Sequence, residues 1–256
     1  MALYLCSLIF NHLTLLKMAN KGRLKKISKQ LSEERPIRFR RYKYLFLIVC
    51  EDEKTEPSYF NEYLSNITAD TIFLKPIGAG RDPKGVVKRA IIERDLLAEE
   101  AKREVDEVWV VFDKDDADEN EKKTKNFYDA FQIAATENFE VAFSNEVFEL
   151  WLLLHFTDVD KEVPLPRNEI YERLKHLFQE IPEYANYEYD HKVIDKRTVE
   201  IIFKVGDRDS AIERAQILFD HHKDSEPIKA NPVTKVHILV QTLLGWIKYF
   251  SYLPDK

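Results

Sequence analysis

The sequence predicts an α/β protein, in which helices cover both faces of a parallel sheet and a mainly helical layer follows towards the C-terminus. Continuous apolar runs with branched side chains, such as Tyr44–Cys50, are typical of strands that are buried on both faces. Segments with helical spacing separate these runs, which favours parallel strands joined by crossover helices. Beyond about Asp158 the apolar residues follow helical patterns, and these predict the second layer.

Strands and helices alternate along the first part of the chain. Strands are predicted at Tyr44–Cys50, 72–77, 108–112 and 139–143, and helices at 55–64, 84–102, 127–135 and 147–156. Thr55 can cap the first helix, and Asp82 followed by Pro83 is a helix start. The segment 147–156 is apolar almost all round, so we expect it deep in the molecule, with Asn145 as its favoured N-cap.

The C-terminal region follows a different pattern. Helices are predicted at 168–179, 209–222 and 232–252. Asn231 followed by Pro232 is a strong helix start, because Asn is a favoured cap and Pro suits the first helical position. Three parts are therefore expected, namely an apolar and basic extension (1–43), an α/β core (44–157) and a mainly helical region packed on that core (158–256).

The composition excludes several classes of protein. A chain of 256 residues that is 45% hydrophobic and 33% charged is neither disordered nor collagen-like. From Leu45 onward there is no uninterrupted apolar run of about 18 residues, which argues against a transmembrane bundle, and no membrane partner is expected. Cys6 and Cys50 are too few for a disulfide framework or a thiolate zinc site, which favours the reducing cytoplasm.

The N-terminal extension combines an apolar start with a basic segment. Residues 1–16 contain Asn11 and His12 and make a poor signal peptide, so a cytosolic start at Met18 and a docking or anchoring segment are both open. Residues 17–43 hold 11 Lys and Arg against 2 acidic residues. Such a segment is often a solvated tail, but clustered cations also bind nucleic acid by releasing its condensed counterions.

Carboxylates follow two of the predicted strands. Glu51 ends the first strand, and Asp113 and Asp115 end a later one, with residues i and i+2 on the same side of an extended chain. If the strands are neighbours, these groups meet at one edge of the sheet, where they repel each other unless a cation lies between them. Mg²⁺ prefers oxygen ligands, so we expect a Mg²⁺ site here, with Mn²⁺ as a substitute.

Other interpretations of the acidic strand ends stay open. Such residues are common in solvated loops and as helix caps. A D-x-D after a strand also occurs in sugar-nucleotide transferases and in phosphate-receiver folds. The residues alone therefore do not separate these classes.

Five blocks of the sequence resemble, in order, those of the RloB-like family. They are VCEDEKTEPSYF (49–60), GAGRDPKGVV (78–87), VWVVFDKDD (108–116), FSNEVFELWLLLHF (143–156) and NPVTKVHILVQTLL (231–244). The resemblance runs from about Arg38 to Leu244 and implies a TOPRIM-like core. It also implies a role in prokaryotic antiviral defence, often beside an AAA-type ATPase.

The resemblance assigns roles to the acidic residues. In TOPRIM domains a glutamate and a D-x-D chelate Mg²⁺ for phosphodiester chemistry, and Glu51, Asp113 and Asp115 stand at these positions. Two residues depart from the family pattern, since Asp52 replaces a glycine and Glu146 replaces a proline.

Several further residues are candidates for the site. Gly78 and Gly80 can present backbone N–H groups to phosphate beside Arg81, although most short glycine loops are simply turns. Lys54 and Lys192 are candidate phosphate contacts. Glu149 lies in an apolar segment, where a carboxylate needs a partner, a proton or a metal, so a catalytic role at the metal site and an internal salt bridge both fit.

Two functions from different classes follow. The first is a Mg²⁺-dependent TOPRIM-like nuclease that cleaves DNA or RNA, with Glu51, Asp113, Asp115 and Glu149 as its catalytic residues. The second is a sensor or adaptor that binds a nucleotide or a partner without cutting and works with an AAA-type ATPase. His155 lies about 1.7 turns beyond Glu149, on another face, so a structural role is favoured for it over that of a base.

Overall fold

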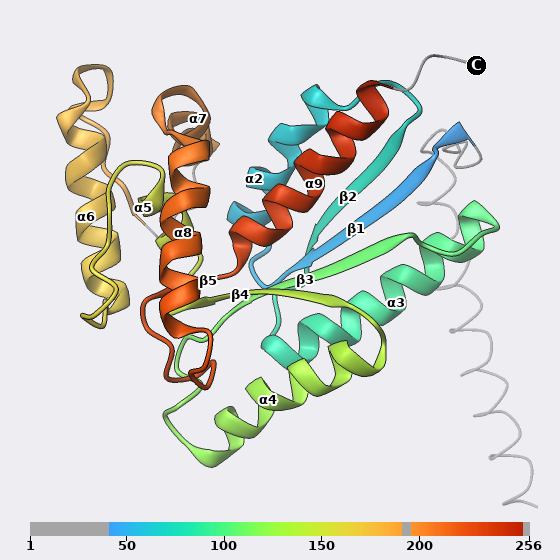
Figure 1. The fold of residues 1–256 in the computed structure, drawn as a ribbon, viewed down its shortest axis with the longest axis horizontal. Coiled ribbons are helices and arrows are strands. Elements are labelled where there is room, and N and C mark those ends of the chain that lie inside the picture. The colour runs from blue at the N-terminus through green and yellow to red at the C-terminus, as the bar shows by residue number, and fades with distance from the viewer. Residues whose placement is uncertain (1–40, 191–195, 253–256) are drawn as a thin grey trace, which may run out of the picture. The chain divides into compact units, whose positions relative to one another are not determined.

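Four parallel strands and one short antiparallel strand form the sheet, in the order β2-β1-β3-β4-β5 (Figure 1). The computed structural model describes residues 41–190 and 196–252. The strands are β1 (Tyr44–Cys50), β2 (Ile72–Gly78), β3 (Glu107–Asp113), β4 (Glu140–Asn145) and β5 (Val233–Thr234). The prediction of an α/β fold with a largely parallel sheet and a helical C-terminal part is confirmed.

Helices cover both faces of the sheet. They are α2 (Thr55–Asn61), α3 (Pro83–Ala101), α4 (Glu121–Thr136), α5 (Glu149–Leu154), α6 (Arg167–Glu180), α7 (Lys196–Val205), α8 (Arg208–His222) and α9 (Val236–Ser251). Alternate residues of β1 enter two separate cores: Phe46 and Ile48 pack with α2, α5 and α9, whereas Leu47 and Val49 pack with α3 and α4. Both faces of β1 are buried, which explains its continuous apolar run.

The starts of the first helices show how local capping works here. Asp82 caps α3 by accepting a hydrogen bond from the N–H of Gly85, and Pro83 occupies the first turn, as predicted. Thr55 begins α2 but does not cap it, because the carboxylate of Asp52 accepts the Thr55 N–H at 2.6 Å. α4 begins at Glu121, well before the predicted residue 127, since its first turn is exposed and carries no apolar pattern.

Two further predicted helix caps are wrong. Asn145 is the last residue of β4, and its side-chain N–H groups bind the carbonyls of Pro227 and Ile228. Asn231 does not cap α9, which begins only at Val236. Residues 233–234 instead form β5, which pairs antiparallel with the end of β4, and this tertiary pairing outweighs the local helix signal.

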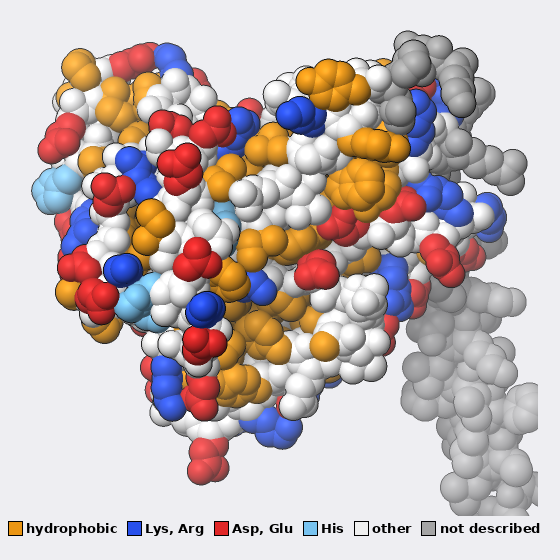
Figure 2. Space-filling view, in the orientation of Figure 1, with side chains coloured by type: hydrophobic (Ala, Val, Ile, Leu, Met, Phe, Trp, Pro, Cys, Tyr) orange, Lys and Arg blue, Asp and Glu red, His pale blue; other side chains and the backbone are white. Residues whose placement is uncertain are grey.

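The helical C-terminal part packs on α5. α6 and α8 both contact α5, and α7, which the sequence pattern does not predict, contacts α2. The face shown in Figure 2 mixes charges of both signs, and apolar side chains gather along α9, where Tyr249 and Tyr252 are exposed. Among the described residues, no helix has the length and apolar character needed to cross a bilayer. Residues 1–40, with nearly all of the basic segment, lie outside the described part of the chain.

Candidate functional site

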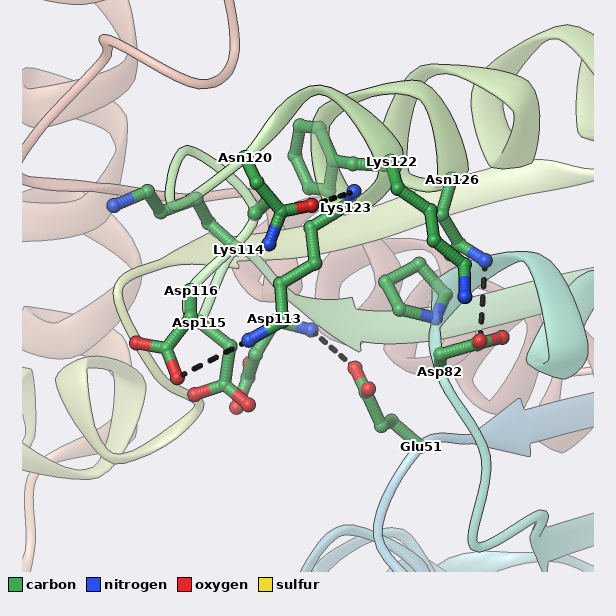
Figure 3. Close-up of a pocket in the computed structure, with 13 residues that line it drawn as sticks. Glu51, Asp82, Asp113, Lys114, Asp115, Asp116, Asn120, Lys122, Lys123 and Asn126 are labelled. Carbon is green, nitrogen blue, oxygen red and sulfur yellow. Dashed lines mark hydrogen bonds and ion pairs between the residues drawn. The ribbon is translucent and has the colours of Figure 1, made fainter.

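Carboxylates from the ends of β1 and β3 meet at one edge of the sheet. β1 and β3 are parallel neighbours with Cys50 opposite Val111, so Glu51 and Asp113 follow at nearly the same level. The N–H of Asp113 donates to Oε2 of Glu51 at 2.9 Å, although 62 positions separate the two residues (Figure 3). This hydrogen bond therefore joins two of the three residues that the sequence suggests as metal ligands.

The turn after β1 is held by two further acidic residues. The carboxylate of Asp52 accepts the N–H of Thr55, and the N–H of Asp52 donates to Oε2 of Glu56 at 3.1 Å. Glu56 is only 1% exposed. Asp52, which stands where the RloB-like pattern has a glycine, thus stabilises the turn that leads into α2. Glu56 has no role in the sequence prediction, because nothing in its local pattern reveals that the side chain is buried.

The glycine loop fits closely against this turn. A Cβ on Gly78 would overlap Cα of Glu53, and one on Gly80, whose φ is +56°, would lie 2.5 Å from Oε1 of Glu53. The N–H groups of Ala79 and Gly80 donate to the carbonyls of Cys50 and Glu51. Gly78 is therefore required by its close approach to the backbone and Gly80 by its positive φ, and their contact with phosphate stays a prediction.

Asp115 is turned towards an arginine that the sequence does not single out. Nη1 of Arg167 lies 2.9 Å from Oδ1 of Asp115, and Nη2 lies 2.8 Å from Oδ1 of Asp116. Nε of the same guanidinium is 3.4 Å from Oε2 of Glu146. Arg167 is the first residue of α6, far along the chain from its partners, so no local motif could have identified it.

Two cavities share Glu51, Asp113 and Asp115 as a common wall. The smaller one, here called the acidic cavity, measures about 220 Å³. It is lined by Glu51, Asp52, Thr55, Glu56, Asp113, Asp115, Val147, Phe148, Glu149 and Tyr171. The larger one, here called the lysine cavity, measures about 440 Å³ and lies under the first turn of α4 (Figure 3). Besides the common wall, it is lined mainly by Asp82, Lys114, Asp116, Asn120, Lys122, Lys123 and Asn126.

Burial makes the carboxylates of this site weak acids. Loss of hydration raises the pKa of Glu51 to about 8, against the opposing hydrogen bond from the N–H of Asp113. Burial, followed by the charges of Glu56 and Glu51, raises the pKa of Asp113 well above its usual range. Oδ1 of Asp113 is buried and has no hydrogen-bond partner among the described residues. Buried carboxylates without cations are costly, so these groups hold protons or need a positive ligand.

Glu149 closes the acidic cavity from the start of α5. The hydroxyl of Tyr189 donates to its Oε1 at 3.3 Å, and burial raises the pKa of Glu149 to about 7. Lys54 and Arg81 are exposed and line neither cavity. Lys192 lies outside the described residues.

The donor atoms fit a hard divalent cation only in part. Within residues 41–190 and 196–252, no group of three or more His, Cys, Asp or Glu side chains is arranged to hold a metal ion. Glu51 and Asp113 do line the same two cavities, and the Asp113 carboxylate has a buried oxygen without a partner among the described residues. Mg²⁺ commonly takes one or two protein carboxylates and completes its shell with water and phosphate. The pair therefore fits such an ion, whereas Asp115 is engaged by Arg167.

Comparison with known proteins identifies a family. The family model described as RloB-like protein matches residues 46–243, which is more than half of the chain. No curated protein and no solved structure matches.

Proposed function

Because the chain belongs to the RloB-like protein family, we propose that it is a Mg²⁺-dependent TOPRIM-like nuclease that hydrolyses phosphodiester bonds of DNA or RNA in prokaryotic antiviral defence. The observation that carries this proposal is the meeting of Glu51 and Asp113 at the carboxyl ends of β1 and β3. In open α/β sheets, ligands bind beyond the carboxyl ends of the strands. Two weakly acidic carboxyl groups at that edge support a site for a divalent cation.

The residues take the following roles in this proposal. Glu51 and Asp113 hold the ion, and Asp115 joins them once it is released from Arg167. Bound Mg²⁺ would polarise the scissile phosphate and assist the attack of water. Glu149, with a pKa of about 7, has the proton affinity of a general base near neutral pH, and Tyr189 fixes its Oε1.

The direct test uses the substitutions Glu51→Gln and Asp113→Asn. Labelled single- and double-stranded DNA and RNA are incubated with each variant in Mg²⁺ or Mn²⁺, and products are resolved on denaturing gels. We expect cleavage to be abolished, because each variant loses a ligand charge while keeping its shape. Glu149→Gln is expected to slow cleavage by about 10²- to 10⁴-fold, the usual contribution of a general base.

The control variant is Asp118→Asn. Asp118 is 59% exposed and lies in the loop that follows Asp113, but it lines neither cavity. It should cleave at the wild-type rate, and thermal unfolding should show that all the variants are folded. Unchanged cleavage by both Glu51→Gln and Asp113→Asn would refute the nuclease proposal.

A second candidate function is a non-catalytic sensor or adaptor that works with an AAA-type ATPase. The observation in its favour is that Arg167 pairs with Asp115, so the described residues do not present a complete set of three metal ligands. Nucleic acid that is bound but not cut, with and without the ATPase, would favour this function. Cleavage that disappears in Glu51→Gln would exclude it.

A further inference from the structure

The wall of the lysine cavity that faces the carboxylates is built from the first turn of α4. The side chains of Lys122 and Lys123 reach from this turn towards Asp82 and the Asp115–Asp116 pair (Figure 3). Nζ of Lys123 lies 3.9 Å from Oδ2 of Asp116. Lys122 is exposed and makes no ion pair with any residue that the structure describes. The proposed metal chemistry uses neither lysine.

The two cavities differ in charge although they share one wall. No lysine or arginine is found among the described residues that line the acidic cavity, whereas the lysine cavity has Lys114, Lys122 and Lys123. Lys114 is buried, and its Nζ is held by Asp118 at 2.9 Å and by Glu146 at 3.2 Å. Nζ of Lys123 also pairs with Glu119, but both side chains are exposed, and exposed ion pairs contribute little to stability. Lys122 and Lys123 are therefore the cations on this side that a phosphate can engage.

The lysine wall is fixed in place by contacts between α3 and α4. Nδ2 of Asn126 donates to Oδ2 of Asp82 at 3.1 Å, and Oδ1 of Asn126 accepts the N–H of Lys84 at 3.2 Å. Nζ of Lys84 also lies 2.6 Å from Oδ2 of Asp129. The starts of the two helices are thus tied together, so the turn of α4 that carries Lys122 and Lys123 has a defined position opposite Glu51 and Asp113.

We propose that Lys122 and Lys123 bind backbone phosphates of a polynucleotide beside the scissile bond, so that the strand lies on the α4 side of the carboxylates. This inference rests on the proposed function and names the substrate-binding wall of the same site. The cavity of about 440 Å³ falls in the range of pockets that enclose a small ligand, so a phosphate with its sugar has room there.

Acidic residues in the same cavity set a condition on this binding. Asp82, Asp115 and Asp116 line it together with the Glu51–Asp113 pair, so an added phosphate is repelled while all of them are ionised. A divalent cation at the pair removes part of that repulsion. Binding at the lysine wall is therefore measured with a divalent cation present, and Ca²⁺, which also takes oxygen ligands, serves for this measurement.

The test compares two double variants that lose the same charge. Lys122→Gln/Lys123→Gln removes the lysine wall, and Lys88→Gln/Lys125→Gln removes two exposed lysines of α3 and α4 that line neither cavity. Fluorescence anisotropy measures the binding of a labelled single-stranded oligonucleotide in Ca²⁺ over a range of salt concentrations. A duplex of the same sequence is the second probe and shows which form the wall accepts.

The first double variant should bind at least about tenfold more weakly, as expected for the loss of charged hydrogen bonds. Its slope of log K against log salt concentration should fall by about 1.4, since each lost phosphate contact on a single strand removes about 0.7. The control should bind within about twofold of the wild type. Equal binding by the two double variants on both probes would overturn the inference, even if the wild type cleaves. Lysine-dependent binding without any cleavage would defeat the nuclease proposal and leave the binding of polynucleotide phosphates by the two lysines standing.

Discussion

A cluster around His155 and the wall of carboxylates around Glu51 both bury polar side chains, and they differ in how their polar atoms are satisfied. In the first, Nδ1–H of His155 donates to the carbonyl of Trp151 at 2.9 Å, and Nε2 accepts from the hydroxyl of Tyr59 at 3.3 Å. The hydroxyls of Tyr59 and Tyr63 are 3.1 Å apart. The second is the wall of carboxylates around Glu51, where Oδ1 of Asp113 has no partner among the described residues.

The cluster around His155 is structural, whereas the carboxylates around Glu51 form a candidate ligand site. A buried polar group that is hydrogen-bonded costs the fold little, whereas a buried carboxylate without a cation is destabilising. Burial lowers the pKa of His155 to about 4 and keeps it neutral, but it raises the pKa of Glu51 to about 8. Strongly perturbed carboxylates in a cavity are typical of functional sites, because folding alone does not require them.

The largest expected effect is the dependence of stability on pH in the absence of divalent cations. The folded-state pKa of Glu51, about 8, lies above its ordinary value of 4.5, so the folded protein binds this proton more tightly than the unfolded chain. The contribution of Glu51 to stability is therefore full below pH 4.5 and is lost as the pH rises to 8. The free energy of unfolding should fall by up to about 1.4 kcal/mol per pH unit in this window.

Urea denaturation in EDTA measures this slope in the wild type and in Glu51→Gln. The variant has no titrating group at position 51, so its slope should be shallower and its stability at pH 8 higher than that of the wild type. If the plots of unfolding free energy against pH are parallel for the two proteins, burial does not raise the pKa of the Glu51 carboxylate. The contrast between the two clusters would then be lost.

His155 should contribute a slope of the opposite sign to the dependence of unfolding free energy on pH. Its pKa falls from 6.5 to about 4 in the folded state, so the unfolded chain binds this proton more tightly. The contribution of His155 is present above pH 6.5 and is lost as the pH falls to 4, by up to about 1.4 kcal/mol per unit. Urea denaturation of the wild type and of His155→Gln over this pH range isolates the contribution of His155 to the free energy of unfolding. A histidine that stays protonated in the fold would give no such difference.

The sequence is most informative where local pattern and tertiary structure agree. β1 and β3 are buried apolar runs, so their positions follow from hydrophobicity, and parallel pairing then brings their ends to one edge. The convergence of Glu51 with Asp113 is predictable for that reason. The start of α3 is equally local, because Asp82 and Pro83 supply both the cap and the first turn.

The remaining features depend on contacts between distant segments. Arg167 pairs with Asp115 across 52 positions, and Asn231 binds the backbone of Leu165 instead of capping a helix. The burial of Glu56 depends on how α2 packs under the turn that follows β1. None of these contacts has a period or motif in the chain, so sequence patterns cannot reveal them.

The next effect in size is stabilisation by Mg²⁺ at pH 8. An ion that binds the folded state alone adds about 2.7 kcal/mol to the free energy of unfolding at 100 times its dissociation constant. This gain should appear in the wild type and vanish in Glu51→Gln/Asp113→Asn. Thermal unfolding with a Mg²⁺ titration measures it without any substrate, and EDTA should reverse it. Equal gains in both proteins would place the ion elsewhere.

The smallest effect belongs to the structural cluster. Tyr59→Phe removes the hydroxyl that joins His155 to Tyr63, so their buried polar atoms lose a partner, which costs about 1–3 kcal/mol. Tyr252→Phe is the matched control, because Tyr252 is 75% exposed. Urea denaturation should show a loss for the first variant and none for the second. The gain in unfolding free energy on adding Mg²⁺ should be the same in both variants, because the Tyr59 hydroxyl does not contact the carboxylates that bind the ion. A smaller gain in Tyr59→Phe would show that the two clusters are coupled.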